Sequence, residues 1–329
     1  MRRVLVTGAT GFIGYRVAEL LAEEGLTPRL MVRRMPRGTI VSHLRAEPVM
    51  GDLRSPDSLR RAVEGCDTVL HLGARASFEP YDTLKPSLID GSRELARVAA
   101  EAGVECLVFA GSLLVYGQVE RGGVPIDAST PPAPASDYGK AKLHAEMEMA
   151  KVCRNAGMAF ASLRLPHVYG ARDAVFSAIR EGGFIMPGDG ENAYGHLHVE
   201  DAARQLIETA RKRLSVISPC ADDRSATWNE FFAQVRRYYP RLRLRKVPRG
   251  LAMAGAGCLA AWSRLRGRQS LETPDGVRSF TLSLPVAEGL LWEELGLQPR
   301  YPTLYQGVPA VLDDCVSYRW MHPLEDNQG

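Results

Sequence analysis

The chain has 329 residues, of which 45% are hydrophobic and 24% charged, and its formal net charge is +3. This is the composition of a soluble globular protein, long enough for one large domain or for a core domain with a smaller lobe. The small net charge gives no electrostatic case for nucleic-acid binding. The six cysteines lie far apart without a CxxC pair, which argues against a zinc site and fits free thiols in a reducing compartment.

Targeting signals are not evident in the sequence. The first apolar run, residues 4–6, is interrupted at once by Thr7 and Gly8, unlike the core of a secretory signal. The longest apolar stretch, residues 251–262, is well short of the roughly 20 residues that cross a bilayer. We therefore expect a cytoplasmic protein without a membrane-spanning helix.

Through the first two-thirds of the chain, short apolar runs typical of buried strands alternate with amphipathic patterns typical of helices. Strands are expected at residues 4–6, 29–32, 49–50, 68–72, 106–110 and 160–165. Helices are expected at residues 15–24, 57–64, 92–102 and 137–156. This alternation predicts parallel strands joined by crossover helices, and the continuously apolar strands predict a sheet covered on both faces. The fold class is therefore α/β, with a doubly wound parallel sheet of the Rossmann type.

After about residue 170 the pattern loosens, and prolines and glycines interrupt it. Helices are still expected at residues 199–211 and 228–238. We interpret this part as a smaller C-terminal α+β lobe. The predicted division is a dinucleotide-binding domain over residues 1–170, to which part of residues 190–220 returns, and a substrate-binding lobe over residues 171–329.

A glycine-rich loop, residues 8–14, joins the first predicted strand to the first predicted helix. In this context Gly8 permits a tight turn, Gly11 lets the backbone approach a pyrophosphate, and Gly14 lets helix and strand pack closely. The helix N-terminus offers free N–H groups and a partial positive charge to phosphates. The loop thus predicts binding of a nicotinamide dinucleotide. The alternative is a glycine-rich turn in another kind of α/β protein.

The loop resembles the opening of the extended short-chain dehydrogenase/reductases, a superfamily that includes the NAD-dependent epimerases and dehydratases. Further matching motifs follow in the family's order, and the resemblance extends from residue 3 to about residue 210. They are Gly51-Asp52-Leu53, His71-Leu72-Gly73-Ala74, Val115-Tyr116-Gly117, Tyr138-Gly139-Lys140-Ala141-Lys142, Arg164-Leu165-Pro166-His167-Val168-Tyr169-Gly170 and His198-Val199-Glu200-Asp201.

The downstream pattern is most similar to the dihydroflavonol-reductase and 3β-hydroxysteroid dehydrogenase-like branch, on residues 228–232, Pro248 before an apolar helix, and residues 295–297. Together the loop and the resemblance imply a set of cofactor-binding residues. These are Gly8, Thr10, Gly11, Phe12, Ile13, Gly14, Arg33, Asp52, Leu53, Leu72, Gly73, Ala74, Tyr138, Lys142 and Pro166.

The end of the second predicted strand bears on the choice between NAD(H) and NADP(H). Rossmann folds that prefer NAD place an acidic residue there to bind the ribose 2′-hydroxyl. Here the strand ends in Arg33 and Arg34, and Arg33 can pair with a 2′-phosphate. We predict that NADP(H) is preferred and that NAD(H) is a second possibility. Asp52 resembles the family aspartate that binds the adenine amino group.

Tyr138 and Lys142 are four residues apart on a predicted helix and therefore share one face. Reduction of a carbonyl needs a proton at the oxygen, and a tyrosine hydroxyl can supply it if a nearby ammonium and the positive nicotinamide lower its pKa from about 10 towards 7. Ser112 follows the strand predicted at residues 106–110, and the resemblance implies that it hydrogen-bonds the substrate oxygen. The alternative for Tyr138 and Lys142 is an ordinary surface pair.

Two positions qualify the resemblance. Leu88 stands where many relatives carry an asparagine that supports the active-site helix, which puts a proton relay through that position in doubt. His196 and His198 form an HxH pair, but the resemblance implies a structural role for His198, and we expect no metal site.

Two further segments allow more than one interpretation. Residues 241–246 alternate between basic and other side chains, as in an edge strand with a solvated basic face, or alternatively a surface for anionic lipid or substrate. Residues 251–262 precede Arg264, Arg266 and Arg268. They predict a core or lid helix over the substrate, or alternatively an interfacial helix, so peripheral membrane contact stays possible.

Within the family, three features argue against a sugar nucleotide. Tyr194 stands where those enzymes usually carry a diphosphate-binding arginine, the stretch over residues 170–188 is short, and Leu113 and Leu114 follow Ser112 where dehydratases need an acid.

We therefore expect an NADP(H)-dependent oxidoreductase that interconverts a ketone and a secondary alcohol on an apolar, polyketide- or steroid-like small molecule. The alternatives are an NAD-dependent sugar-nucleotide epimerase or dehydratase, and a non-catalytic dinucleotide sensor. The resemblance also implies a homodimer through the helices predicted at residues 92–102 and 137–156.

Overall fold

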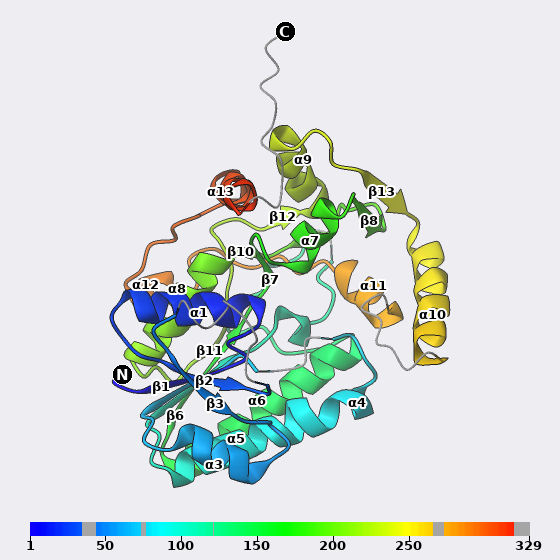
Figure 1. Ribbon diagram of the computed structural model, residues 1–329. Coiled ribbons are helices and arrows are strands. Elements are labelled where there is room, and N and C mark those ends of the chain that lie inside the picture. The colour runs from blue at the N-terminus through cyan, green and yellow to red at the C-terminus, as the bar shows by residue number, and fades with distance from the viewer. Residues whose placement is uncertain (35–43, 74–76, 121, 266–272, 319–329) are drawn as a thin grey trace.

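The computed structural model describes residues 1–34, 44–73, 77–120, 122–265 and 273–318. At its centre lies a seven-stranded sheet in the order β11-β6-β5-β4-β1-β2-β3, in which all neighbouring strands are parallel (Figure 1). The chain starts in the middle of the sheet and winds outward in both directions, so the doubly wound Rossmann topology is confirmed. The strands are β1 (Val4–Thr7), β2 (Arg29–Val32), β3 (Glu47–Met50), β4 (Thr68–His71), β5 (Cys106–Ala110), β6 (Ala159–Arg164) and β11 (Ile217–Pro219).

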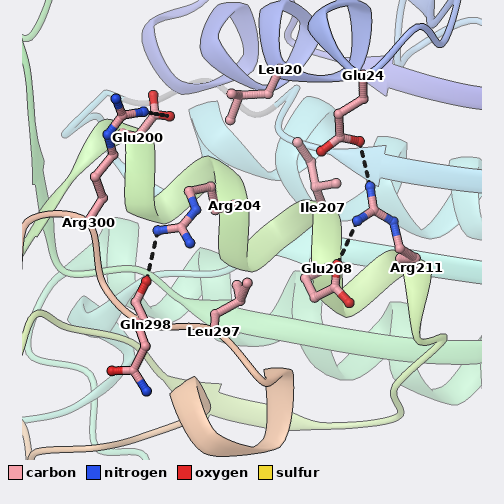
Figure 2. A pocket seen from close by; sticks show the side chains of 10 residues that line it. All are labelled: Leu20, Glu24, Glu200, Arg204, Ile207, Glu208, Arg211, Leu297, Gln298 and Arg300. Carbon is pink, nitrogen blue, oxygen red and sulfur yellow. Dashed lines mark hydrogen bonds and ion pairs between the residues drawn. The ribbon is translucent and has the colours of Figure 1, made fainter.

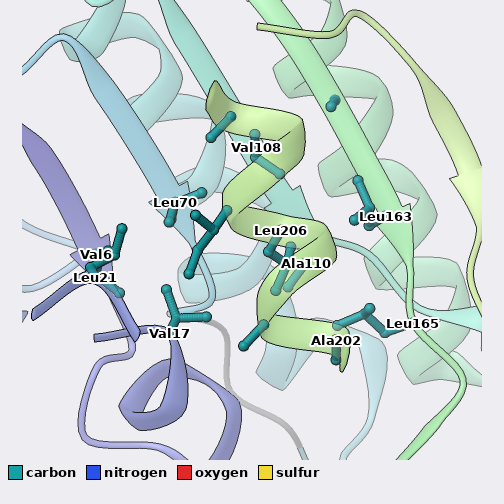
Figure 3. Close-up of a cluster of buried hydrophobic side chains, with 14 of the residues drawn as sticks. Val6, Val17, Leu21, Leu70, Val108, Ala110, Leu163, Leu165, Ala202 and Leu206 are labelled. Atoms are coloured by element: carbon teal, nitrogen blue, oxygen red, sulfur yellow. The ribbon is translucent and has the colours of Figure 1, made fainter. Parts of the chain in front are cut away.

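Helices cover both faces of this sheet. One face carries α1 (Phe12–Glu23), α8 (Val199–Arg211) and the short α12 (Trp292–Leu295). Figure 3 shows this layer: Leu21 of α1 and Leu206 of α8 lie against strand residues such as Val108. The other face carries α3 (Pro56–Val63), α5 (Gly91–Glu101) and α6 (Asp137–Ala156). The sheet is therefore buried on both sides, which explains its continuously apolar strands.

A second group of elements lies beyond the carboxyl ends of the strands (Figure 1). It contains three two-stranded sheets, several helices and an aromatic core built on Phe231 and Phe232. The sheets are β7 (His167–Tyr169) with β10 (His196–His198), β8 (Phe184–Pro187) with β13 (Leu244–Val247), and β9 (Ala193–Tyr194) with β12 (Ala226–Thr227). The helices are α7 (Ala174–Arg180), α9 (Trp228–Tyr238), α10 (Arg249–Leu265), α11 (Pro274–Phe280) and α13 (Leu304–Ser317).

The chain returns to the central sheet through α8 and β11 after this lobe has begun. The domain boundary at residue 170 stays a prediction. None of the helices within the described ranges is both long enough and apolar enough to cross a membrane.

The predicted bounds of five elements, β2, β5, α6, α8 and α9, match the structure to the residue. Local signals explain two of them. Ser136 caps α6 by accepting the Gly139 N–H at 3.0 Å, and Gly157 ends it in the left-handed conformation, φ 66°. Helix α9 begins with a capping box formed by Thr227 and Glu230.

The region before α5 differs from the prediction. A helix starts eleven residues earlier than expected, as α4 (Tyr81–Lys85), and continues through a π-helical turn, Pro86–Asp90, into α5. Pro86 has no N–H to donate, and the N–H of Gly91 reaches back five residues to its carbonyl. Leu88 lies in this wide turn and is fully buried in the core. It therefore offers no amide for hydrogen bonding at the position where many relatives carry an asparagine.

A buried ion pair joins α6 to the end of β6. The Arg164 guanidinium donates to both carboxylate oxygens of Glu146, at 3.1 and 2.7 Å, and to the Tyr116 hydroxyl at 2.6 Å. Ser162 donates to the same carboxylate at 2.7 Å. Both charges are therefore paired and hydrogen-bonded, which is the condition for keeping them in a core.

We expect Arg164→Met to lower the free energy of unfolding by about 3–5 kcal/mol, because it leaves the Glu146 carboxylate buried without its partner. Urea denaturation followed by circular dichroism measures this change. The double variant Arg164→Met/Glu146→Leu should recover more than half of the loss, since it removes both charges. A double variant as unstable as the single one would contradict this explanation, because the loss of stability would then not come from an unpaired buried carboxylate.

Candidate active site

The glycine loop forms a close-fitting cradle at the carboxyl end of β1. Gly8 has φ 71°, and a Cβ at Gly14 would lie 2.2 Å from the Gly8 carbonyl oxygen, so no side chain fits there. A Cβ at Gly73 would lie 2.6 Å from Thr7 Oγ1. No side chain caps α1, whose N-cap is Gly11, so its first N–H groups are free of side-chain acceptors. These features fit the pyrophosphate of a dinucleotide.

A chain of buried hydrogen bonds holds the cradle in place. The Gly73 N–H donates to Thr7 Oγ1 at 2.8 Å, Thr7 Oγ1 lies 2.7 Å from His71 Nδ1, and His71 Nε2 lies 2.9 Å from Ser92 Oγ. Burial lowers the pKa of His71 to about 3, so the ring is neutral and can donate through one nitrogen and accept through the other. Sequence reasoning missed this chain, because polar residues inside strands carry no signal of their partners.

Two arginines lie close to Asp52, in the loop after β3. Arg54 binds the Asp52 carboxylate at 3.0 Å and donates its N–H to it at 2.9 Å, which lowers the pKa of Asp52, and the nearby charge of Arg33 contributes in the same direction. Arg33 itself is exposed at the end of β2. Leu53 is buried where a Cβ on Gly91 would touch it at 2.7 Å. Basic groups thus surround Asp52, the predicted adenine-binding residue.

The remaining predicted cofactor residues lie in or near the cradle. Thr10 is exposed on the loop, Ile13 packs against the sheet, and Leu72 is half-buried. The Phe12 ring lies beside Gly170, where a Cβ would come within 2.9 Å of it. Pro166 follows β6, and Ala74 lies outside the described residues.

Ser112, Tyr138 and Lys142 meet because α6 starts directly against the end of β5. A Cβ at Gly139 would lie 2.1 Å from the Leu114 carbonyl oxygen, so only glycine allows this approach. Leu114 belongs to a 3₁₀ turn, Leu113–Val115, which Ser112 caps by accepting the Leu114 N–H at 3.2 Å. The structure thus brings the serine turn and the tyrosine helix together.

Lys142 is deeply buried. Its Nζ donates to the Ala110 carbonyl at 2.8 Å and lies 4.5 Å from the centre of the Phe109 ring and 5.9 Å from that of Tyr138. Burial lowers the pKa of Lys142 to about 7, although the negative Glu146 one helical turn away opposes the shift. This amine can therefore gain or lose a proton near neutral pH.

Tyr138 departs from expectation. Burial raises its pKa above the ordinary value of 10, whereas the sequence predicted a pKa lowered by the neighbouring ammonium. The reason is that burial disfavours the phenolate, while the Lys142 amine points to the Ala110 carbonyl. In the protein alone, Tyr138 is a proton donor and not a phenolate.

Asp275, from the distant α11, reaches the N-terminus of the tyrosine helix. Its carboxylate accepts the N–H groups of Asp137 at 3.3 Å and Tyr138 at 3.4 Å. Thr273, which caps α11, also donates to the Phe78 carbonyl at 2.8 Å, and the Phe78 ring contacts Tyr138 at 5.4 Å. Sequence reasoning did not find Asp275, because no local pattern links positions 137 residues apart.

An apolar cluster packs around Tyr138 on its open side. Tyr194 lies in this cluster, and burial raises its pKa, with a contribution from Tyr138 nearby. Partly buried Phe78, Tyr138 and Leu143 pack against it. Its buried members are Leu113, Leu114, Val115, Tyr116, Ile126, Tyr194, Ala221, Leu282, Leu284 and Val286.

His196 and His198 do not point to one site. His196 lies in the aromatic core, where its Nδ1 is 3.0 Å from Nδ1 of His167 and its ring stacks on Phe231. His198 accepts the Glu200 N–H at 3.2 Å and caps α8. Among the described residues no group of three His, Cys, Asp or Glu side chains could hold a metal ion.

A family model described as the NAD dependent epimerase/dehydratase family matches residues 4–216, about two-thirds of the chain and all of the cradle and catalytic helix. The chain belongs to this family. It is therefore an enzyme of the extended short-chain dehydrogenase/reductase type and depends on NAD(P).

Two curated relatives span almost the whole enzyme. A ceramide reductase of Caulobacter vibrioides is 28% identical over 87% of this chain and 88% of its own. The N-acetyl-alpha-D-glucosaminyl-diphospho-ditrans,octacis-undecaprenol 4-epimerase of Escherichia coli O157:H7 is 25% identical over 98% and 97%. The UDP-glucose 4-epimerase of Thermus thermophilus, solved with NAD, has a TM-score of 0.76 at 22% identity and covers 94% of this chain and 98% of its own, which shows the fold.

The enzyme has a hollow away from Tyr138, between α1 and α8 (Figure 2). Ion pairs cross it: Arg211 binds Glu24 at 2.5 Å and Glu208 at 2.9 Å, and Arg300 binds Glu200 at 3.2 Å. Because its charges pair with one another, the hollow is a surface feature with satisfied polar groups.

We expect Lys142→Met to stabilise the cofactor-free enzyme while abolishing turnover. Between pH 7 and 10.5 the unfolded chain holds a proton on this amine that the folded enzyme does not, so the free energy of unfolding rises with pH in this window. The variant should lose that dependence and gain roughly 1–3 kcal/mol at pH 7, after subtraction of the lost bond to Ala110. Thermal melts across this pH range measure it.

The matched control is Lys140→Met, because Lys140 is an exposed lysine on the same helix. It should change the free energy of unfolding by no more than about 0.5 kcal/mol. A Lys142→Met variant that melts lower than the wild type at pH 7 would contradict the burial penalty assigned to this amine.

Proposed function

We propose that the enzyme is an NADP(H)-dependent oxidoreductase that interconverts a ketone and a secondary alcohol on an apolar small molecule of polyketide or steroid size. The observation that carries the proposal is the apolar cluster around Tyr138. A charged sugar diphosphate needs donors to replace its water shell, and aliphatic and aromatic side chains offer none. Tyr194, where the sugar-nucleotide enzymes usually carry an arginine, belongs to this cluster.

The chemistry divides among three residues. A bound nicotinamide dinucleotide supplies the hydride to the carbonyl carbon, or receives it in the reverse direction. Tyr138 gives its hydroxyl proton to the carbonyl oxygen, which completes the alcohol, and its raised pKa keeps the hydroxyl protonated until a bound cofactor changes its surroundings. Ser112 donates a hydrogen bond to the same oxygen as charge develops there. Lys142 would hold the nicotinamide ribose, and in its protonated form it can return a proton to the Tyr138 phenolate.

Names among the relatives agree with an apolar substrate. Ceramide is a lipid, and other relatives are a sterol-4-alpha-carboxylate 3-dehydrogenase of Dictyostelium discoideum and a ketoreductase of Stigmatella aurantiaca that acts on a farnesyl-substituted quinoline oxide. These matches are 24–28% identical, so they favour the substrate class and not one molecule.

A second candidate is a sugar-nucleotide epimerase or dehydratase that uses NAD. The match to the Escherichia coli epimerase over nearly the whole chain favours it. Enzymes of that class keep NAD tightly bound, so the absorbance of the purified protein distinguishes the two. Retained NAD together with turnover of a sugar diphosphate would establish the epimerase.

Exposed Arg33 at the end of β2 supports NADP(H). We expect Arg33→Ala to raise the Kd for NADPH about tenfold and to leave the Kd for NADH unchanged, because only the 2′-phosphate needs the guanidinium. Fluorescence titration measures both constants. Arg154→Ala, at an exposed arginine at the end of α6, is the control and should change neither. Tighter binding of NADH than NADPH by the wild type would rule out the NADP(H) preference.

We expect Tyr138→Phe to lower kcat by about 10²–10⁴, because the proton donor is lost. The Kd for NADPH should stay within about twofold of the wild type, because one hydroxyl contributes little to the binding of a whole dinucleotide. Oxidation of NADPH with a panel of apolar ketones measures turnover. Turnover retained by the variant would remove Tyr138 from the mechanism.

We also infer a homodimer through α5 and α6 in a reducing, cytoplasmic compartment. The two helices pack side by side, Arg93 and Glu148 join them at 3.5 Å, and Met147 is exposed on their outer surface. All six cysteines are free, which suits a reducing environment.

A further inference from the structure

Helix α10 lies at the outer edge of the enzyme and packs against α11 (Figure 1). Its inward face is made of small residues, and Ala256 and Ala260 are buried there. The sequence left open whether this helix is a lid, a core element or an interfacial helix. Its burial pattern decides against a core helix, because the opposite face is open to solvent.

That outward face is an apolar stripe. Leu251 is 66% exposed, Leu259 is 44% exposed and Trp262 is 51% exposed. Exposed Ala254, Gly255 and Cys258 lie between them at helical spacing. Residues 250–263 contain no charged side chain, so the stripe is continuous over almost four helical turns. A stripe of this size at the surface marks an interaction site.

Cationic side chains flank the stripe. Arg249 begins α10, and exposed Arg243 and Arg245 lie on or beside β13, which Pro248 joins directly to α10. Arg245 pairs in register with Ile185 of β8, which is also largely exposed. Within the described ranges, no ion pair is recorded for these three arginines. The surface therefore combines unneutralised positive charge with exposed aliphatic and aromatic groups.

We propose that the apolar stripe of α10, with the arginines of β13, binds the surface of an anionic phospholipid bilayer. The 17 residues of α10 fall short of the roughly 20 needed to span a bilayer, so the helix lies in the plane of the interface. Leu251, Leu259 and Trp262 enter the boundary between headgroups and acyl chains, and the arginines contact lipid phosphates.

A second copy of the chain fits the stripe less well. A second copy would bring its own Arg243, Arg245 and Arg249 to the same interface, and like charges oppose that arrangement. An anionic bilayer, in contrast, complements charge and apolar surface at once.

Helix α10 is connected to the helix of Tyr138 and Lys142 through α11. Helix α10 packs on α11, and Asp275 of α11 accepts the Tyr138 N–H. A bilayer bound to the stripe is thus separated from the catalytic helix by a single helix. The proposal itself needs no particular substrate and stands apart from the proposed function.

The test uses the full-length enzyme and vesicles of phosphatidylcholine with phosphatidylglycerol. Flotation should recover the wild type with the vesicles, and Leu251→Glu and Leu259→Glu should each weaken binding about tenfold or more, since they place a carboxylate in the interface. The control is Val124→Glu, the same kind of change at a position that is 85% exposed elsewhere. It should bind like the wild type. Turnover of a water-soluble ketone should be equal in all of them.

Trp262 offers an independent readout. Trp228 and Trp292 are buried, and Trp320 lies outside the described residues, so the measurement uses a Trp320→Phe background, in which a blue shift of tryptophan emission on adding vesicles reports chiefly on Trp262. The variant Trp262→Phe should still float with the vesicles and lose most of the shift. If a glutamate variant fails to fold, Arg243→Glu/Arg245→Glu tests the same surface from its charged side and should also weaken binding.

Three results would overturn the proposal. If the wild type bound equally well to vesicles of pure phosphatidylcholine, lipid charge would have no role in binding. If both glutamate variants bound like the wild type, the apolar stripe would not be the binding surface. Wild type that stays in the aqueous fraction, together with a dimer that Leu259→Glu dissociates in light scattering, would assign the stripe to a second copy.

Discussion

The contact between Gly139 and the Leu114 carbonyl oxygen is the constraint on which the reaction centre depends. It fixes the distance between the first turn of α6 and the turn that follows β5, and no other residue type fits there. Because α6 is a regular helix from its Ser136 cap onward, the positions of Tyr138 and Lys142 follow from that one approach. Ser112 is placed by the strand on the other side of the contact.

The electrostatics of the site follow from how deeply this contact buries its polar groups. Lys142 lies against Phe109 and has one backbone carbonyl as its partner, so the charged amine is disfavoured until a further negative or polar group arrives. Glu146 supplies a compensating charge one turn away but is itself committed to Arg164. In the protein alone Tyr138 is therefore protonated, and Lys142 changes its charge near neutral pH.

Sequence periodicity was sufficient for β1 to β6 of the central sheet and for its longer covering helices, because those elements are specified by local apolar patterns and caps. It missed the short edge strand β11 and the short helix α12. It was insufficient where a backbone or side chain depends on a distant partner. The proline at position 86 argued against a helix there, so the continuous helix before α5 was not predicted. The contacts of Asp275 and the hydrogen bonds between Thr7, His71 and Ser92 join segments that are far apart in sequence. The four-residue spacing correctly predicted that Tyr138 and Lys142 share one face of the helix. It could not predict that the Lys142 amine donates its hydrogen bond to the Ala110 carbonyl.

The carboxylate of Asp275 at the N-terminus of α6 also has a meaning for how the chain is made. The cradle, the serine turn and the tyrosine helix are all synthesised before residue 157, yet the N–H groups of Asp137 and Tyr138 find their side-chain acceptor on α11. A nascent chain can therefore close its nucleotide-binding half early. The Asp275 carboxylate that completes the start of α6 is therefore synthesised only after the cradle, the serine turn and the tyrosine helix.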